Sequence, residues 1–180
     1  MSRPSHIAIL FVDGYNIIGA WSDLQDLRDR HGLEVARQHL IEVMTSYSAF
    51  RGYDTRIVFD AYQKATRDRH ETITANLSVC YTNFGQTADS YIEVACAKFR
   101  NSIEKYEKRL IVATSDRAQQ ITVIGYGAEW MSASKLAQDV SAADRQVRRP
   151  QSSQTKHRRP SLENSLDPAL RQRLEALRFG

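Results

Sequence analysis

Short, mainly apolar runs alternate with segments of helical spacing along the first 145 residues of this 180-residue chain. The run at 7–12 is continuously apolar and those at 56–59, 77–81 and 110–113 are short and mainly apolar, which is typical of strands buried on both faces. Between them, segments such as 33–50 place an apolar residue every three or four positions, as an amphipathic helix does. The alternation predicts an α/β fold with a mostly parallel central sheet flanked by helices.

The remaining segments of the domain are assigned from local signals. Thr87 has the position of an N-cap, so a helix is expected to begin directly after it. A helix is expected at 117–124, an edge strand at 129–131, and a last helix from a cap at Ser132 or Ser134 to about residue 145. The polar and basic stretch at 62–74 is predicted to be a loop.

Composition changes sharply after residue 145. Residues 1–144 hold 16 Lys and Arg against 18 Asp and Glu, whereas residues 145–180 hold 9 against 3. We therefore predict three parts: a domain at 1–145, a basic disordered linker at 146–164, and a short helix within 165–180. A basic tail on a near-neutral domain favours a polyanionic partner or serves only as a solubilising segment.

Several classes of protein are disfavoured by the sequence. No apolar run approaches the ~20 residues that span a bilayer, so we expect a cytoplasmic protein without a membrane partner. Cys80 and Cys96 both fall in apolar positions and are expected to be buried free thiols. The five histidines lack metal-ligand spacing, which leaves zinc without support. The oligomeric state is left open.

Aspartates occupy equivalent places at the ends of the predicted strands. Asp13 ends the first strand, Asp60 the second and Asp116 follows the fourth, while Asp89 lies in the first turn of the helix after the third. Parallel strands open their carboxyl ends on one edge of a sheet, where ligands bind. Converging carboxylates repel one another unless a hard cation neutralises them, so we expect Mg²⁺ or Mn²⁺ at this edge.

Each of these acids also has a plainer interpretation. An aspartate after a strand is often a turn or helix-cap residue, and the Asp13–Gly14 pair alone would be read in that way. Asp89 could be an acid favoured by the helix dipole, and Asp116 a cap. The recurrence at four strand ends favours the metal site. Glu93, one turn after Asp89, could reach the same site or face solvent.

The residues around these acids carry a family resemblance. The quoted segments are Asp-Gly-Tyr-Asn-Ile-Ile-Gly-Ala-Trp at 13–21, Val-Phe-Asp-Ala at 58–61, Gln-Thr-Ala-Asp at 86–89, and Val-Ala-Thr-Ser-Asp at 112–116. In order and spacing they resemble the YacP-like NYN family, nucleases related to PIN domains. The resemblance covers roughly the first 145 residues, although the segment 63–76 matches poorly.

This resemblance implies a PIN-like fold and Mg²⁺-dependent endonucleolytic cleavage of RNA. By position, Asp13, Asp89 and Asp116 match the catalytic, metal-binding acids of the family. Asn16 and Ser115 match polar positions beside the site, and Asp60 matches a family feature of less certain role. Relatives are described as acting on messenger RNA at the ribosome, so RNA and the ribosome are the expected partners.

A negative site needs positive and aromatic neighbours to hold RNA. Among cations, Arg117 and Lys135 are favoured because each follows a strand end, and Lys64, Arg67 and Arg69 are further candidates. Most surface cations are simply solvated. Tyr15 and Trp21 could stack on a base, whereas burial against a helix is an equal alternative for Trp21.

The leading hypothesis is in-line hydrolysis of an RNA phosphodiester by water that the metal activates, leaving 5′-phosphate and 3′-hydroxyl ends. The first alternative is a non-catalytic RNA- or ribosome-binding module that retains the nuclease fold. A phosphatase-type aspartate nucleophile is disfavoured, because position 15 holds Tyr and not the second acid that such enzymes carry. A structure-specific DNA nuclease would share this acidic edge.

Overall fold

The computed structural model describes residues 6–61 and 69–148, within the first of two units, at 1–148. The first half comprises β1 (Ala8–Asp13), α1 (Gly14–Ala20), α2 (Ser22–His31), α3 (Leu33–Arg51), β2 (Tyr53–Phe59), β3 (Arg69–Thr74) and β4 (Leu77–Tyr81). The second half comprises α4 (Ala88–Arg100), the 3₁₀ helix η1 (Ile103–Tyr106), β5 (Arg109–Ala113), α5 (Arg117–Gly125), β6 (Glu129–Met131) and α6 (Ala133–Arg148).

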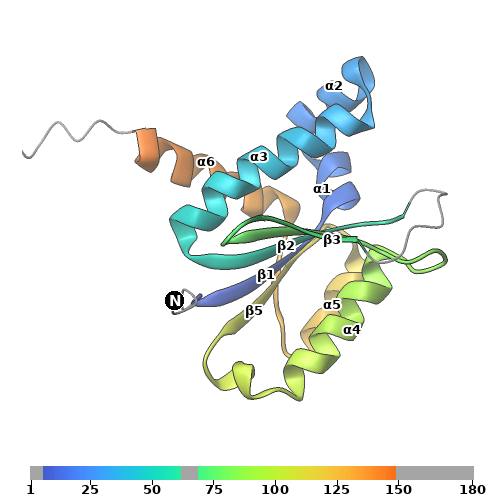
Figure 1. Cartoon of the computed structure of the whole chain (residues 1–180), viewed down its shortest axis with the longest axis vertical. Coiled ribbons are helices and arrows are strands. Elements are labelled where there is room, and N and C mark those ends of the chain that lie inside the picture. Colours follow the sequence, from blue (N-terminus) through green and yellow to red (C-terminus); the bar gives the residue numbers. More distant parts are fainter. Residues whose placement is uncertain (1–5, 62–68, 149–180) are drawn as a thin grey trace, which may run out of the picture. The chain divides into compact units, whose positions relative to one another are not determined.

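The strands form one six-stranded sheet in the order β3-β4-β2-β1-β5-β6 (Figure 1). All neighbouring strands are parallel except β3, which runs antiparallel to β4. The first strand of the chain therefore lies in the middle of the sheet, between β2 and β5. The predicted α/β class with a mostly parallel sheet is confirmed.

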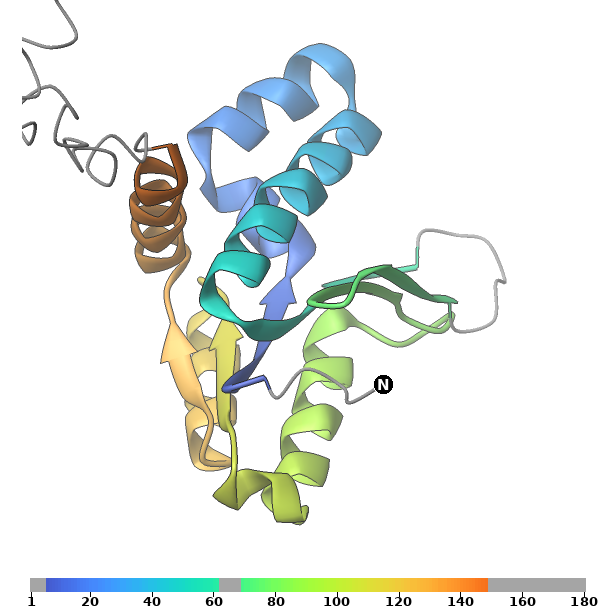
Figure 2. The same ribbon diagram turned by 60° about the vertical axis from the view of Figure 1, so that its left-hand side comes forward.

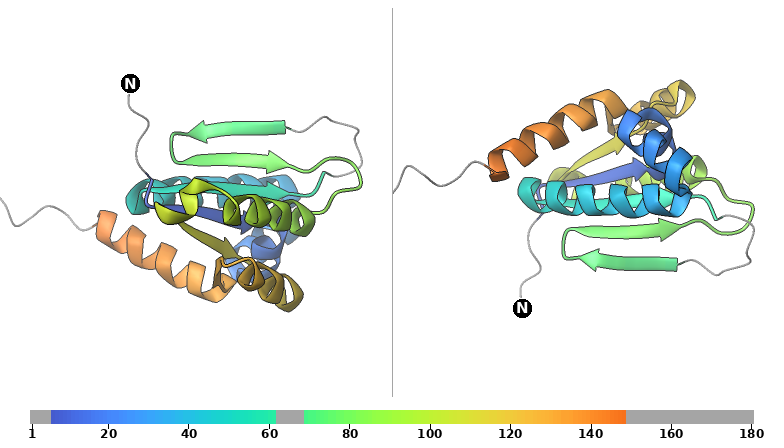
Figure 3. Two further views of the ribbon diagram at one scale, coloured as in Figure 1. Left: turned by 90° about the horizontal axis from the view of Figure 1, so that it is seen from below. Right: turned by 90° about the horizontal axis from the view of Figure 1, so that it is seen from above.

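Helices cover both faces of the sheet. Helices α1, α2, α3 and α6 lie on one face and α4 and α5 on the other, as Figures 2 and 3 show. Along β1, Leu10 and Val12 pack toward the first group, whereas Ile9 and Phe11 pack toward the second. Because β1 is buried on both sides, every position in it is apolar until Asp13.

The predicted loop at 62–74 is wrong in its second half. Residues Arg69–Thr74 form β3, an edge strand paired with β4 and interrupted by an irregularity between Thr72 and Thr74. An edge strand needs no apolar alternation on its free side, so its polar sequence concealed it. The first half of that segment, 62–68, lies outside the described residues.

Other boundaries agree closely with the sequence. Thr87 accepts a hydrogen bond from the amide of Ser90 as the N-cap of α4, and Ser132 accepts one from the amide of Lys135 at the start of α6. Helices α1 and α2 were not anticipated. The last helix continues to Arg148, and the predicted linker beyond it and terminal helix lie outside the described residues.

Two of the sequence-based exclusions concern the described residues directly. Cys80 and Cys96 are both buried and unbridged, as predicted. Within 6–61 and 69–148, no helix combines the length and apolarity needed to cross a membrane.

Candidate active site

Four aspartates lie at the carboxyl edge of the sheet. Asp13 is the last residue of β1, Asp60 directly follows β2, Asp89 is the second residue of α4, and Asp116 immediately precedes α5. Strands β1, β2, β4 and β5 are mutually parallel, so all four acids are delivered to the same edge. This convergence, predicted from strand ends alone, is what the fold produces.

Asp13 is held by the turn from β1 into α1. Its side chain is 8% exposed, and its Oδ1 accepts a hydrogen bond of 3.2 Å from the amide of Asn16, which caps α1. The ring of Phe59 packs directly against Gly14, so that any Cβ there would collide with it. A residue with a side chain would push α1 away from β2, and the position of Asp13 depends on this close approach.

The carboxyl groups of Asp13 and Asp89 lie close enough for each to shift the pKa of the other. Burial raises the pKa of Asp13 to about 7, with further contributions from the charges of Asp89 and Asp60 and an opposing one from the Asn16 amide. Burial also raises the pKa of Asp89, as do the charges of Asp116 and Asp60, while the capacity of the neighbouring Asp13 carboxyl to donate a proton to it lowers that pKa. Two carboxyl groups that retain protons this readily mark a site where negative charge is crowded and uncompensated.

Asp60 and Asp116 also cap helices. The Oδ1 of Asp60 accepts the amide of Ala88 at the start of α4, the helix that carries Asp89. The Oδ1 of Asp116 accepts the amide of Ala118 at 2.7 Å, in the first turn of α5. The capping interpretation is therefore correct for both. Asp60 and Asp116 also belong to the acidic cluster, because the charge of each raises the pKa of Asp89.

Asn16 connects two distant parts of the edge. Its Oδ1 accepts a 2.6 Å hydrogen bond from the amide of Ser115, which tethers the loop after β5 to the first turn of α1. In the same loop, the hydroxyl oxygen of Thr114 accepts the amide of Asp116 at 3.1 Å. These two bonds set where Asp116 stands relative to Asp13.

The donor chemistry of this cluster suits a hard cation. The described ion pairs leave Asp13, Asp60, Asp89 and Asp116 without any Lys, Arg or His partner. Within the described part of the chain, however, no three acidic, histidine or cysteine side chains are close enough together to hold an ion by themselves. Mg²⁺ commonly takes one or two carboxylates and keeps several waters, so the Asp13–Asp89 pair fits it.

The other predicted neighbours are placed unequally. Glu93 is half-buried and its charge acts on Cys96, not on Asp13 or Asp89. Arg117 is exposed at the first position of α5, next to Asp116. Lys135 is exposed on α6 and pairs with Asp139 at 2.9 Å. Arg69 begins β3, and Lys64 and Arg67 lie outside the described residues.

The two aromatic residues proposed for stacking are packed within the protein. Tyr15 lies 5.0 Å from the ring of Phe59, and its hydroxyl accepts a hydrogen bond from Arg37. The indole of Trp21 donates to the carbonyl of Ala133 at 2.9 Å, which joins the α1–α2 junction to α6. Both residues are half-buried, and Trp21 also lines a groove next to α6.

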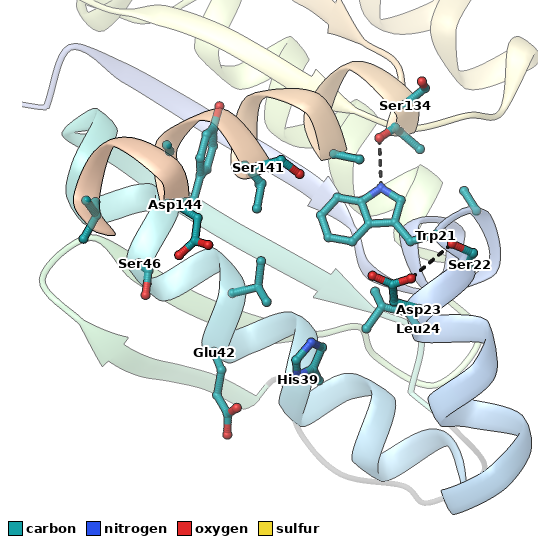
Figure 4. Close-up of a pocket in the computed structure, with 18 of the residues that line it drawn as sticks. Trp21, Ser22, Asp23, Leu24, His39, Glu42, Ser46, Ser134, Ser141 and Asp144 are labelled. Atoms are coloured by element: carbon teal, nitrogen blue, oxygen red, sulfur yellow. Dashed lines mark hydrogen bonds between the residues drawn. The ribbon is translucent and has the colours of Figure 1, made fainter. Parts of the chain in front are cut away.

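A groove of about 920 Å³ lies beside the acidic cluster, between α3 and α6 (Figure 4). Trp21 forms part of its lining, together with Glu42 and His39 from α3 and Asp144 from α6, and Ser115 links it to the edge. The groove and the four aspartates are therefore adjacent, but they are not the same place. The acidic side chains in its lining would repel a phosphate backbone, so the groove is not suited to bind RNA phosphates.

Sequence reasoning missed two residues at this edge. Phe84 is 77% exposed in the loop between β4 and α4. Arg37 stacks at about 6 Å over the rings of Phe59 and Tyr81. A signal for Phe84 was present, since an aromatic residue before Gly85 in a polar strand-to-helix connection is unusual. Arg37 had none, because an arginine on an amphipathic helix is ordinarily solvated.

Comparison with known proteins agrees with the predicted fold and family. The model of the YacP-like NYN domain matches residues 10–179. The uncharacterized protein YacP of Bacillus subtilis is 36% identical over 141 residues, which are 78% of this chain and 79% of the relative. A crystal structure of Rae1 (YacP) from Bacillus subtilis matches with a TM-score of 0.65 at 32% identity, covering 96% of this chain and 95% of that one.

A single-substitution mutant of the same Rae1 (YacP) matches with a TM-score of 0.64 at 35% identity, covering 78% of this chain and 79% of that one. The fold is thus the PIN-like NYN fold of these structures. The family model spans most of the chain and the curated relative is closely similar over most of its length. The chain belongs to the YacP-like NYN domain family, a family consistent with nuclease-type activity.

Proposed function

We propose that this protein is a Mg²⁺-dependent endoribonuclease that hydrolyses phosphodiester bonds of RNA. One observation carries the proposal: buried Asp13 and half-buried Asp89 lie at the carboxyl edge close enough to shift each other's pKa, with the charge of Asp60 acting on both and that of Asp116 on Asp89. Two neighbouring acids with raised pKa values, Asp13 and Asp89, are costly to keep ionised, and a bound divalent cation would offset that cost. Membership of a nuclease-type family supports the same activity.

Asp13 and Asp89 would hold the ion, with Asp116 completing the negative field around it. When bound, Mg²⁺ or Mn²⁺ supplies Lewis-acid polarisation of a phosphate oxygen and activation of water for in-line attack. Because burial favours the protonated form of Asp13, that carboxyl releases its proton as positive charge arrives. Loading of the site is therefore expected to weaken as the pH falls below neutrality.

The remaining residues position these acids. Asp60 fixes the first turn of α4, and so the direction of Asp89, by capping the helix. Asn16 holds the loop that carries Asp116. To Arg117, exposed beside Asp116, and Lys135, exposed on α6, we assign contact with substrate phosphates. In this proposal the acids carry out the reaction, and the hydrogen bonds of Asp60 and Asn16 hold them in position.

The substrate assignment extends the proposal beyond the site itself. We infer messenger RNA, met at the ribosome in the cytoplasm, as the target of this activity. The basic composition of 145–180 supports a polyanionic partner, because 9 Lys and Arg stand there against 3 Asp and Glu. The opposed candidate, a binding module without catalysis, is an outcome of the test that follows.

The test compares three full-length proteins on an end-labelled single-stranded RNA: wild type, Asp13→Asn, and Asp26→Asn. Asp26 is exposed on α2 and provides a matched loss of charge outside the group of four aspartates. Wild type and Asp26→Asn should cleave in Mg²⁺, leave 5′-phosphate ends and stop in EDTA, whereas Asp13→Asn should bind RNA without cleaving it. Wild-type binding without cleavage would establish the non-catalytic module, and unchanged cleavage by Asp13→Asn would refute the assigned site.

A further inference from the structure

We propose that Phe84 is a base-stacking residue that makes the site select unpaired RNA. This inference rests on the proposed function and assigns it a substrate class, single-stranded RNA with an exposed base near the bond that is cut. Phe84 is carried by the loop between β4 and α4, and the sequence offered no role for it.

The loop is at the reacting edge. Strand β4 ends at Tyr81 and runs parallel to β2, so residues 82–87 leave the sheet on the side where the four aspartates gather. Figure 3 shows this connection beyond the end of the sheet toward which β4 points. The loop leads directly into α4, and Asp89 follows Phe84 by five positions. A nucleotide held by Phe84 would adjoin the acidic cluster.

The loop is also fixed at both ends. The amide of Thr82 donates to the carbonyl of Phe59 and its hydroxyl oxygen accepts the amide of Ala61, both at 3.0 Å. At the other end, Thr87 caps α4. Between them, the amide of Gln86 donates to the carbonyl of Asn83 at 3.0 Å around Gly85, whose φ of 83° favours glycine. Phe84 is therefore presented by a defined turn.

Phe84 presents its ring to solvent. It is 77% exposed, whereas Phe59 is fully buried and Tyr15 and Tyr81 pack against it. A phenylalanine side chain has no polar atom that could hydrogen-bond to water, so exposing its ring to solvent is unfavourable. An exposed ring at this polar edge is therefore suited to packing against a flat apolar partner. Every nucleobase offers such a face, and stacking on aromatic rings is how many proteins hold single-stranded RNA.

Stacking on Phe84 requires a base that is free of its own duplex. In an A-form helix both faces of a base are covered by neighbours, and side chains reach only the groove and backbone. A continuous duplex therefore gains nothing from Phe84, while a single strand or a loop does. Phe84 thus couples cleavage to the absence of pairing.

The experiment measures kcat and KM for Mg²⁺-dependent cleavage of one RNA as a single strand and within a duplex. The proteins are wild type, Phe84→Ala, Phe84→Trp and Tyr106→Ala. Tyr106 is the matched control: it is 81% exposed, but it lies in η1 before β5, at the opposite edge of the sheet. Since Phe84 is exposed, its replacement should leave thermal unfolding unchanged.

We expect Phe84→Ala to raise KM on the single strand between about five- and about 140-fold, the range that corresponds to ~1–3 kcal/mol per stacked base. Phe84→Trp should restore the wild-type KM, and Tyr106→Ala should not alter it. In wild type, an abasic site placed at one particular position of the RNA should raise KM as much as Phe84→Ala does. In Phe84→Ala, an abasic site at that position should raise KM no further. Wild type should cleave the duplex poorly.

Equal KM values for Phe84→Ala and Tyr106→Ala, or the lack of any such coupled position, would overturn the inference and leave the nuclease proposal intact. Failure of wild type to cleave any RNA in Mg²⁺ would overturn both. The two proposals therefore fail in recognisably different ways.

Discussion

Replacing Asp13 by asparagine should stabilise the metal-free protein while it abolishes cleavage. Asparagine retains an Oδ1 that can accept the amide of Asn16, and it is as good an N-cap for α1 as aspartate. What the substitution removes is a charge that burial and the neighbouring acids penalise. The variant therefore avoids the free-energy cost of a buried charge and keeps the hydrogen bond to the amide of Asn16.

The magnitude follows from the pKa of Asp13, which rises from 3.8 to about 7 on folding. Between these two values the folded state retains a proton that the unfolded chain has released, so stability falls as the pH increases. At 1.36 kcal/mol for each pKa unit, the full penalty above pH 7 is at most about 4 kcal/mol. Below pH 3.8 both states are protonated and this penalty vanishes.

The assay is urea unfolding of wild type and Asp13→Asn in EDTA at pH 5 and at pH 8. Asp13→Asn should exceed wild type by ~2–4 kcal/mol at pH 8, and by less at pH 5. Added Mg²⁺ should then recover stability in wild type at pH 8 and have little effect on the variant. A variant that is less stable than wild type at pH 8, or that keeps the wild-type pH dependence, would refute the reasoning.

Three further changes test the scaffold around the acids. Asn16→Ala removes the acceptor for Ser115, so we expect kcat for RNA cleavage to fall at least about tenfold and unfolding free energy to drop by ~1 kcal/mol, from kinetics and melts. Gly14→Ala forces a Cβ onto the Phe59 ring and should destabilise the fold by ~1–3 kcal/mol in urea titrations. Trp21→Phe breaks one hydrogen bond to α6 and should cost ~1 kcal/mol by the same measurement.

Much of the fold could be predicted because its central strands are buried on both faces. Residues 8–12 of β1 and 110–113 of β5 are apolar and all buried, so these strands can be predicted from the sequence without knowing what packs against them. Strand β3 escaped prediction for the opposite reason, since its free edge tolerates polar residues such as His70 and Thr72. Strands buried on both faces were therefore easier to predict from the sequence than the edge strand β3.

The acidic site could be anticipated from topology and the contacts within it could not. Strand ends predict that Asp13, Asp89 and Asp116 share an edge, because parallel strands share a direction. Nothing in the sequence predicts which two carboxyl groups affect each other most strongly, since that depends on the directions of the side chains at the end of β1 and the start of α4. For the same reason sequence reasoning chose Tyr15 for stacking, a ring that the fold turns inward.

The central place of β1 has a consequence for the order in which activity appears during synthesis. The strand made first pairs with β2 on one side and with β5, made much later, on the other. The charge of Asp116 can act on Asp89 only after β5 has been inserted. On the proposed function, the cleavage centre would therefore be complete only when nearly the whole domain has been translated.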